Sequence, residues 1–232
     1  MLGVVVEPLD FYERLGAKNY ELVIRGLDWN GPEHMRQALA GLDLRGAKVA
    51  DLGIGTGQLS DIFRAHSVGR IIGIDGVTEF LTQVIDSRRA DEAILSDLTK
   101  SRVPLHSENV DLITASGLFA YIADPAPLLA EMMRVTKPGG YIAFNFHPSA
   151  VSAGSSSERV NAAAVMQTRA VYTMHHHSPL RLSGFMTLSG CETIAIRQEA
   201  HGVKRFADES WIPLVTCVYR KPGGAPSAHT LS

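Results

Sequence analysis

The chain has 232 residues, of which 45% are hydrophobic, 7% aromatic and 20% charged. These values are typical of globular proteins and exclude collagen, coiled-coil and disordered chains. The 22 basic and 24 acidic side chains give a formal net charge of −2, which argues against a nucleic-acid partner bound by phosphate neutralisation. We expect one domain over residues 1–222 and a flexible tail over 223–232.

The two cysteines, Cys191 and Cys217, lie outside any Cys/His spacing typical of zinc or of a disulfide framework. No metal site is therefore predicted, and a reducing compartment fits best. The apolar start, Met1–Val6, lacks the basic region and long apolar run of a signal peptide. No stretch approaches the roughly 20 apolar residues that span a bilayer. We predict a cytoplasmic protein that binds no membrane.

From residue 47 onward, β-branched runs alternate with helical patterns, which is typical of βαβ units around a parallel sheet. Strands are predicted at 48–52, 70–75, 92–96, 110–116 and 141–146. Three helices are predicted between them from apolar residues at helical spacing: Leu59, Ile62 and Phe63; Phe80, Leu81, Val84 and Ile85; Leu128, Leu129, Met132 and Met133. Asp124 and Pro125 are predicted to begin the last helix, and Lys137–Gly140 to end it.

Beyond His147 the pattern changes, and the small residues of 148–157 predict a mobile loop. A helix over 161–170, a strand over 171–177 and a helix over 180–188 are expected next. Two later runs, 192–198 and 212–219, predict an antiparallel pair that closes one sheet edge.

A glycine-rich loop, Val49–Gly57, lies between the first strand and the first helix of this series. Gly53 and Gly55 allow the backbone to approach a ligand closely, and the helix beyond offers free N–H groups. The loop reads GxGxG rather than the GxGxxG of dinucleotide folds, and Asp51 just before it would repel a pyrophosphate but suits an ammonium group. The pattern therefore predicts an amino acid joined to a nucleoside as the cofactor.

Two aspartates follow at the ends of the next two strands. Asp75 lies 22 residues after Gly53, the position at which a carboxylate accepts ribose hydroxyls. Asp97 lies another 22 residues on, where it can accept from the amine of adenine while Leu98 covers a ring face. A helix-capping role is the competing interpretation of Asp97.

Together these motifs resemble the seven-stranded class I S-adenosylmethionine-dependent methyltransferases. The segments that carry the resemblance are 51–57, 74–76, 96–98, 110–116 and 137–140. The resemblance implies a doubly wound, Rossmann-like α/β fold with seven strands in the order 3-2-1-4-5-7-6, strand seven antiparallel, and S-adenosylmethionine as cofactor. Within the family, the chain is most similar to small-molecule methyltransferases of the Williams-Beuren-region type, which open with a tyrosine-rich helix.

The resemblance also implies three parts of the domain: a helical lid over 1–44, a cofactor-binding core over 45–146, and an acceptor-side insertion with closing strands over 147–222. Residues 116–118 would lie beneath the reacting centre. The implied cofactor-binding residues are Tyr20, Asp51, Gly53, Gly55, Asp75, Gly76, Asp97, Leu98 and Ser116. Tyr12 and Tyr121 are predicted to bind the acceptor, and Trp29 is a further candidate for lining its pocket.

Histidines follow the predicted core. His147 comes directly after strand 141–146, at the sheet edge where α/β proteins hold ligands, so it is either a catalytic base or an ordinary loop histidine. His175 and His177 would share one strand face about 7 Å apart. We favour a polar strand lining the acceptor cavity over a metal site, because no carboxylate follows at ligand spacing.

The predicted function is methyl transfer, by in-line displacement, to an oxygen, nitrogen or carbon atom of a small organic acceptor, by a monomer or homodimer. One alternative is a non-catalytic subunit that binds S-adenosylmethionine and activates a partner. A nicotinamide-dependent oxidoreductase is a second alternative, and Asp51 and the glycine spacing disfavour it.

Overall fold

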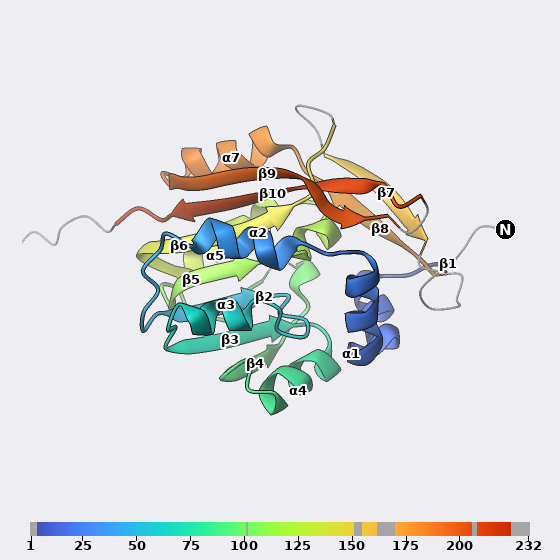
Figure 1. Cartoon of the computed structure of the whole chain (residues 1–232). Helices are drawn as coiled ribbons and strands as arrows, with labels where there is room; N and C mark the ends of the chain where they lie inside the picture. Colours follow the sequence, from blue (N-terminus) through green and yellow to red (C-terminus); the bar gives the residue numbers. More distant parts are fainter. Residues whose placement is uncertain (1–3, 101, 151–154, 162–169, 206–207, 224–232) are drawn as a thin grey trace, which may run out of the picture.

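The computed structural model describes the chain except for residues 1–3, 101, 151–154, 162–169, 206–207 and 224–232 (Figure 1). The strands are β1 (Val4–Val5), β2 (Lys48–Leu52), β3 (Arg70–Asp75), β4 (Glu92–Leu95), β5 (Val110–Ala115), β6 (Thr136–Phe146), β7 (Ser156–Asn161), β8 (Ala170–His176), β9 (Glu192–Lys204) and β10 (Trp211–Arg220). The helices are α1 (Pro8–Gly26), α2 (Gly31–Leu39), α3 (Ser60–Ala65), α4 (Thr78–Asp86), α5 (Ala126–Val135) and α7 (Pro179–Leu188), with short 3₁₀ turns η1 (Leu98–Lys100) and η2 (Leu118–Tyr121).

Seven of these strands form one sheet in the order β4-β3-β2-β5-β6-β10-β9. The strands β2 to β6 pair in parallel, and β10 is antiparallel to both of its neighbours. Counted along the chain from β2, this order is 3-2-1-4-5-7-6, so the predicted α/β fold is confirmed (Figure 1).

Helices cover both faces of this sheet because each face carries a stripe of buried apolar residues. One cluster joins α5 and α7 to the sheet through side chains such as Leu128 and Met186. The other joins α2, α3 and α4 to the opposite face through side chains such as Leu39, Phe63 and Val84. The layers leave the carboxyl ends of β2, β3 and β5 open toward α1 (Figure 1).

A second, three-stranded sheet in the order β1-β8-β7 was not predicted. Its β7 includes Ser156 and Ser157, so the prediction of a loop over the whole of 148–157 is wrong at its end. The predicted helix over 161–170 falls mostly outside the described residues, and its two end residues belong to β7 and β8. Pairing with β8 satisfies the backbone of this polar segment, which is why strand forms where the sequence lacks an apolar pattern.

Two element boundaries differ from the sequence prediction. Helix α5 begins at Ala126, one residue later than expected, and the Asp124 carboxylate accepts a hydrogen bond from the Ala126 N–H at 3.2 Å. Strand β6 begins at Thr136 rather than at Tyr141, because Thr136 pairs with Val110 before a shift in register. The segment predicted only to end a helix thus also starts a strand.

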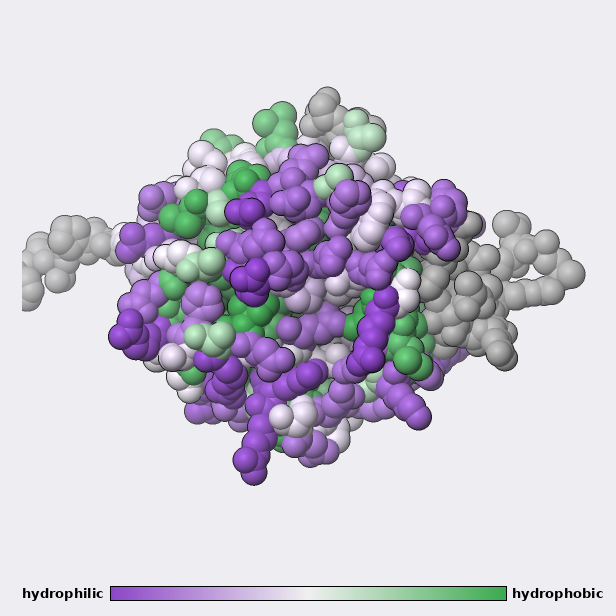
Figure 2. All heavy atoms as spheres, in the orientation of Figure 1, coloured by the Kyte–Doolittle hydropathy of each residue, from purple (hydrophilic) through white to green (hydrophobic). Residues whose placement is uncertain are grey.

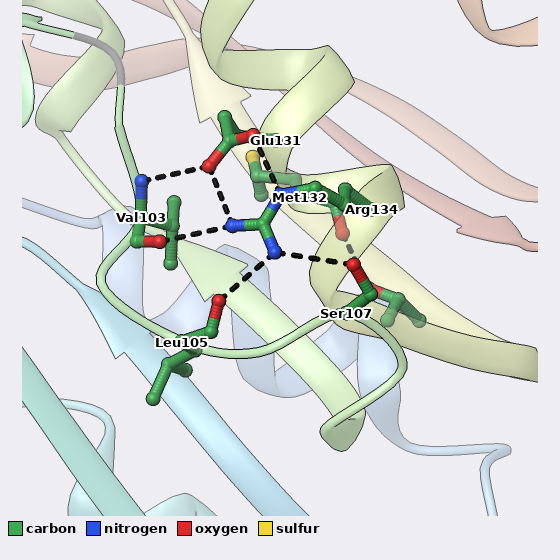
Figure 3. Close-up of polar contacts among 7 residues, drawn as sticks. Val103, Leu105, Ser107, Glu131, Met132 and Arg134 are labelled. Atoms are coloured by element: carbon green, nitrogen blue, oxygen red, sulfur yellow. Dashed lines mark hydrogen bonds and ion pairs between the residues drawn. The ribbon is translucent and has the colours of Figure 1, made fainter.

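The connection between η1 and β5 is fixed by Arg134 of α5 (Figure 3). Its guanidinium donates to the carbonyls of Val103 and Leu105 at 3.0 and 2.9 Å and pairs with Glu131 at 2.7 Å. Glu131 also accepts from the Val103 N–H at 3.1 Å. These charge-assisted bonds satisfy backbone groups of a segment without regular structure, and so anchor the chain that follows η1.

The face of the molecule drawn in Figure 2 is mostly hydrophilic, with hydrophobic residues scattered between polar ones. Within the part of the chain that the structure describes, no helix is both long enough and apolar enough to cross a membrane.

Candidate active site

The glycine loop predicted to bind the cofactor follows β2 directly. Gly53, Gly55 and Gly57 have positive φ angles of 67°, 52° and 80°, a conformation that glycine adopts at low cost. Arg89 holds the loop from outside through a hydrogen bond to the Thr56 carbonyl at 2.7 Å. The loop thereby presents its backbone to a cavity at the carboxyl ends of the parallel strands, where α/β sheets bind ligands.

The cavity is lined by α1, the glycine loop, the ends of β3 and β5, η1, η2 and β8. Eight of the nine residues predicted to bind the cofactor line it: Tyr20, Gly53, Gly55, Asp75, Gly76, Asp97, Leu98 and Ser116. The loop with positive φ angles and the two carboxylates fit a nucleoside with an amino-acid tail. No structural comparison assigns their individual contacts, so each role stays a prediction.

Asp51 is the exception. It is absent from the residues that line the cavity, and its contact with the cofactor's ammonium group stays a prediction. It is buried on the sheet, and its carboxylate accepts a hydrogen bond from the Thr114 hydroxyl of β5 at 2.7 Å. Burial and the nearby Asp75 raise the pKa of Asp51 to about 7, although the hydrogen bond from Thr114 lowers it in part. The side chain therefore supports the floor beneath the loop.

Asp75 ends β3 beside the glycine loop. Its two carboxylate oxygens accept from the Gly55 N–H at 2.9 Å and the Val77 N–H at 3.0 Å. Burial raises its pKa, and these backbone hydrogen bonds oppose the rise. The side chain lines the cavity, so the acceptor capacity that these bonds leave is available to a ligand there. Asp75 thus links the loop to the site of the predicted ribose.

Asp97 has the helix-capping role that was the competing interpretation, and its contact with adenine stays a prediction. Its carboxylate accepts from the Thr99 N–H at 3.0 Å and pairs with Lys100 at 3.0 Å, so it caps η1. It also lines the cavity, next to Leu98. Burial raises the pKa of Asp97, but the hydrogen bonds from Thr99 and Lys100 outweigh this and keep the pKa below its ordinary value.

The tyrosines of α1 reach the cavity because the helix kinks at Gly16, where φ is 69°. Glu79 of α4 accepts from the Ala17 N–H at 3.1 Å and so caps the second half of the helix. Tyr12 and Tyr20 then lie on either side of the kink with their rings 5.6 Å apart. Both line the cavity.

The tyrosine rings continue from α1 toward β8. Tyr121 of η2 lies 5.5 Å from Tyr12, and Tyr172 of β8 lies 5.8 Å from Tyr121. The Tyr12 and Tyr121 hydroxyls share a hydrogen bond. Burial raises the pKa of each of the three, so all stay protonated near neutral pH.

His147 lines the cavity at the end of β6 and is only 4% exposed. Its Nδ1 donates to the Pro213 carbonyl at 3.0 Å, because a carbonyl oxygen can only accept. In the neutral ring, Nε2 is therefore the unprotonated nitrogen. Burial lowers the pKa of His147 to about 4, so its ring is neutral near pH 7.

The other two predicted histidines do not reach the cavity. His177 is fully buried, and its Nε2 donates to the Phe119 carbonyl at 2.8 Å. His175 is partly buried but absent from the cavity lining. The wall is formed by Tyr172 and Met174, on the opposite strand face to His175. The prediction chose the right strand and the wrong face.

Asn145 was missed by the sequence analysis. This fully buried side chain of β6 donates to the Ser116 hydroxyl at 2.9 Å and accepts from the Gly117 N–H at 2.8 Å. It thereby fixes the turn after β5 that lines the cavity. An amide between Phe144 and Phe146 was the available signal, because a buried polar side chain needs hydrogen-bond partners.

Residues 50–144, which contain the glycine loop and the carboxylates of the cavity, match the family model described as a methyltransferase domain. This part of the chain is therefore similar to methyltransferase domains, in agreement with the resemblance that the motifs indicate. The predicted cofactor class is thereby confirmed. The matched region ends before His147, so it does not test the acceptor side.

Among curated proteins, the chain is similar to the malonyl-[acyl-carrier protein] O-methyltransferase of Yersinia pestis, with 32% identity over 100 residues, 43% of this chain and 36% of that protein. The chain thus spans less than half the length of this relative. It also spans less than half of two other curated relatives, covering 45% of one and 31% of the other.

Solved structures of low sequence identity share the methyltransferase fold. The Haloferax volcanii complex between the Trm112 methyltransferase activator and a methyltransferase matches with a TM-score of 0.64 and 19% identity, over 94% of this chain and 100% of that one. An S-adenosylmethionine-dependent methyltransferase from Mesorhizobium loti matches with a TM-score of 0.61 and 17% identity, over 82% and 96%.

Proposed function

We propose that this protein transfers the methyl group of S-adenosylmethionine to a small organic acceptor. The observation that carries the proposal is a cavity with two kinds of lining. The glycine loop and the carboxylates of Asp75 and Asp97 line it together with aromatic rings and His147. A cofactor and a second molecule can therefore lie side by side, as an in-line displacement requires.

The residues at the cofactor end have inferred roles in binding the parts of S-adenosylmethionine. When bound, S-adenosylmethionine supplies a methyl group on a positively charged sulfur. We infer that Asp75 accepts from the ribose hydroxyls, that Asp97 and Leu98 hold adenine, and that the loop at Gly53 and Gly55 lies against the methionine part. The buried Asp51 supports this loop from below.

At the other end, His147 is suited to align the acceptor rather than to store a proton. Its Nε2 can accept a hydrogen bond from an O–H or N–H group of the acceptor, while Pro213 fixes the ring from behind. With a pKa of about 4, the imidazole is a weak base. Methylation makes the attacked atom far more acidic, so the proton can pass to Nε2 as the new bond forms and then to water.

The finer classification is part of the same proposal. The α1 tyrosines in the cavity support a relation to Williams-Beuren-region-type enzymes, with residues 1–44 as a lid over the core. We infer a cytoplasmic monomer or homodimer. A non-catalytic subunit is disfavoured, because binding the cofactor alone would not require the His147 end of the cavity.

The test is consumption of S-adenosylmethionine. Purified protein is mixed with the methyl-labelled cofactor and small-molecule extracts, and release of S-adenosylhomocysteine is followed. We expect turnover that depends on extract, and stabilisation by S-adenosylmethionine but not by NADH on heating. Tight binding of the cofactor without turnover in any extract would instead identify a non-catalytic subunit, and stabilisation by NADH an oxidoreductase.

A further inference from the structure

The acceptor end of the cavity is built on one face of β8. Tyr172 and Met174 line the cavity, and His176 is the next residue on the same face of the strand. The His176 ring lies 5.9 Å from that of His147. At about 3.3 Å per residue, the strand runs about 13 Å from Tyr172 to His176, which does not itself line the cavity but lies beside His147, which does. The Tyr172 and His147 parts of the lining are thus farther apart than the width of a single aromatic ring.

The sides of this space are apolar and aromatic. Trp29, Leu27, Val203 and Ala120 pack in one cluster with Met174 and line the cavity. The centre of the Trp29 ring lies 6.4 Å from that of the His147 ring. The Trp29 ring also lies close to Gly117, because a Cβ placed on Gly117 would be 3.4 Å from a carbon of that ring. Surfaces of this kind bind flat apolar molecules, since rings gain both burial and stacking geometry.

Hydrogen-bonding groups stand at both ends of the wall. At the β8 end near Tyr172, the Tyr12 and Tyr121 hydroxyls share a hydrogen bond, and the Tyr172 ring lies 5.8 Å from that of Tyr121. That bond uses one of the three hydroxyl protons, so a donor remains for a ligand. At the other end, Nε2 of His147 is an acceptor. The space therefore offers a donor and an acceptor, separated by apolar walls.

We propose that the methyl acceptor is a planar two-ring aromatic molecule with a hydroxyl group at one end and a carbonyl oxygen at the other. This inference rests on the proposed function. The hydroxyl donates to Nε2 of His147, and the carbonyl accepts from the tyrosine hydroxyls. In the reaction the carbon–sulfur bond of the cofactor breaks as the carbon–oxygen bond of an aryl methyl ether forms, and the hydroxyl proton leaves through His147 to water.

The probe is 6-acetyl-2-naphthol, with 2-naphthol lacking the carbonyl, 2-acetylnaphthalene lacking the hydroxyl, and monomethyl malonate as an acidic probe. Binding is measured by calorimetry with and without S-adenosylhomocysteine. We expect 6-acetyl-2-naphthol to bind best, with each missing group weakening binding about 3- to 10-fold, the effect of one neutral hydrogen bond. Its methyl ether should form when S-adenosylmethionine is added.

Tyr172→Phe tests the donor end. It should weaken 6-acetyl-2-naphthol about 3- to 10-fold and leave 2-naphthol unchanged, because only the former has a carbonyl to lose. Tyr121→Phe is the second variant if the first fails to fold. Tyr219→Phe is the matched control: its buried ring donates to Ser183 at 3.2 Å and lies outside the cavity lining, so both probes should bind as before.

Equal binding of all four probes, or tightest binding of monomethyl malonate, would overturn the inference. Because the probes are also titrated without cofactor, this result is distinct from failure of the proposed function. That failure would appear as a protein that binds no S-adenosylhomocysteine, whatever the naphthols do.

Discussion

Asp75 is predicted to carry both the cofactor site and the shape of the glycine loop. In Asp75→Ala the N–H groups of Gly55 and Val77 lose their carboxylate acceptor. Hydrogen bonds to a charged group contribute about 1.5–3 kcal/mol each. Water can reach these N–H groups through the cavity, so we expect the lower part of the summed range, a loss of about 3–4 kcal/mol in the free energy of unfolding.

The same substitution removes the predicted acceptor of two ribose hydroxyls. Two lost bonds at the lower part of this scale weaken binding by about 3–4 kcal/mol, which is about 150- to 1,000-fold in the dissociation constant. Because Asp75 also holds the glycine loop in shape, a change of the loop in the variant should weaken cofactor binding further. Calorimetric titration with S-adenosylhomocysteine, together with urea unfolding, measures the two effects separately.

Asp111→Ala is the matched control. Asp111 also accepts a backbone N–H, that of Lys48 at 2.9 Å, and pairs with Lys137, but it does not line the cavity. It should lower stability and leave cofactor affinity unchanged. If Asp75→Ala remains folded and binds S-adenosylhomocysteine as tightly as the wild type, Asp75 has no place in the site and the reasoning is refuted.

His147 and Arg134 give the remaining predictions. Because burial lowers the His147 pKa to about 4, the acidic limb of turnover should lie near pH 4, and a limb near 6.5 would contradict this environment. The pKa of His147 is lower in the folded than in the unfolded protein, so its contribution to stability is complete above pH 6.5 and is lost as the pH falls toward 4. His147→Gln should therefore make the urea midpoint of unfolding depend less on pH between 4 and 6.5. Arg134→Met removes hydrogen bonds to the Val103 and Leu105 carbonyls, so it should lower the free energy of unfolding by about 1–3 kcal/mol in urea denaturation. Arg64→Met is the control: it loses an exposed ion pair and should lower the free energy of unfolding by under about 1 kcal/mol in the same assay.

The cofactor end could be predicted because its signals are local. A turn with positive φ needs glycine, as at Gly53 and Gly55, and a carboxylate at a strand end shows directly in the sequence, as Asp75 does. Asp51 shows the limit of such reasoning. In a strand, side chains point alternately to the two faces of the sheet. At the tight turn after β2, the direction of a side chain depends instead on the conformation of the loop, which the sequence pattern does not specify.

The acceptor end was harder because its parts meet only through long-range pairing. β7 is stabilised by β8 rather than by an apolar pattern of its own, and Tyr172 reaches the cavity because β8 turns that face inward. Burial of His147 depends on Trp29, which lies far away along the chain. No window of sequence contains these partners, so neither the cavity-facing side of β8 nor the lowered pKa of His147 could be read from it.

The pairing of β1 with β8 links the N-terminal helix to the acceptor wall. Val4 and Val5 pair in parallel with the first two residues of β8, three residues before α1 begins at Pro8. A movement that lifts α1 from the glycine loop therefore pulls on the strand that carries Tyr172. If residues 1–44 open as the proposed lid, cofactor exchange and acceptor exchange would share one opening step. A methyltransferase opened in this way would release both products in the same event rather than holding one while it exchanges the other.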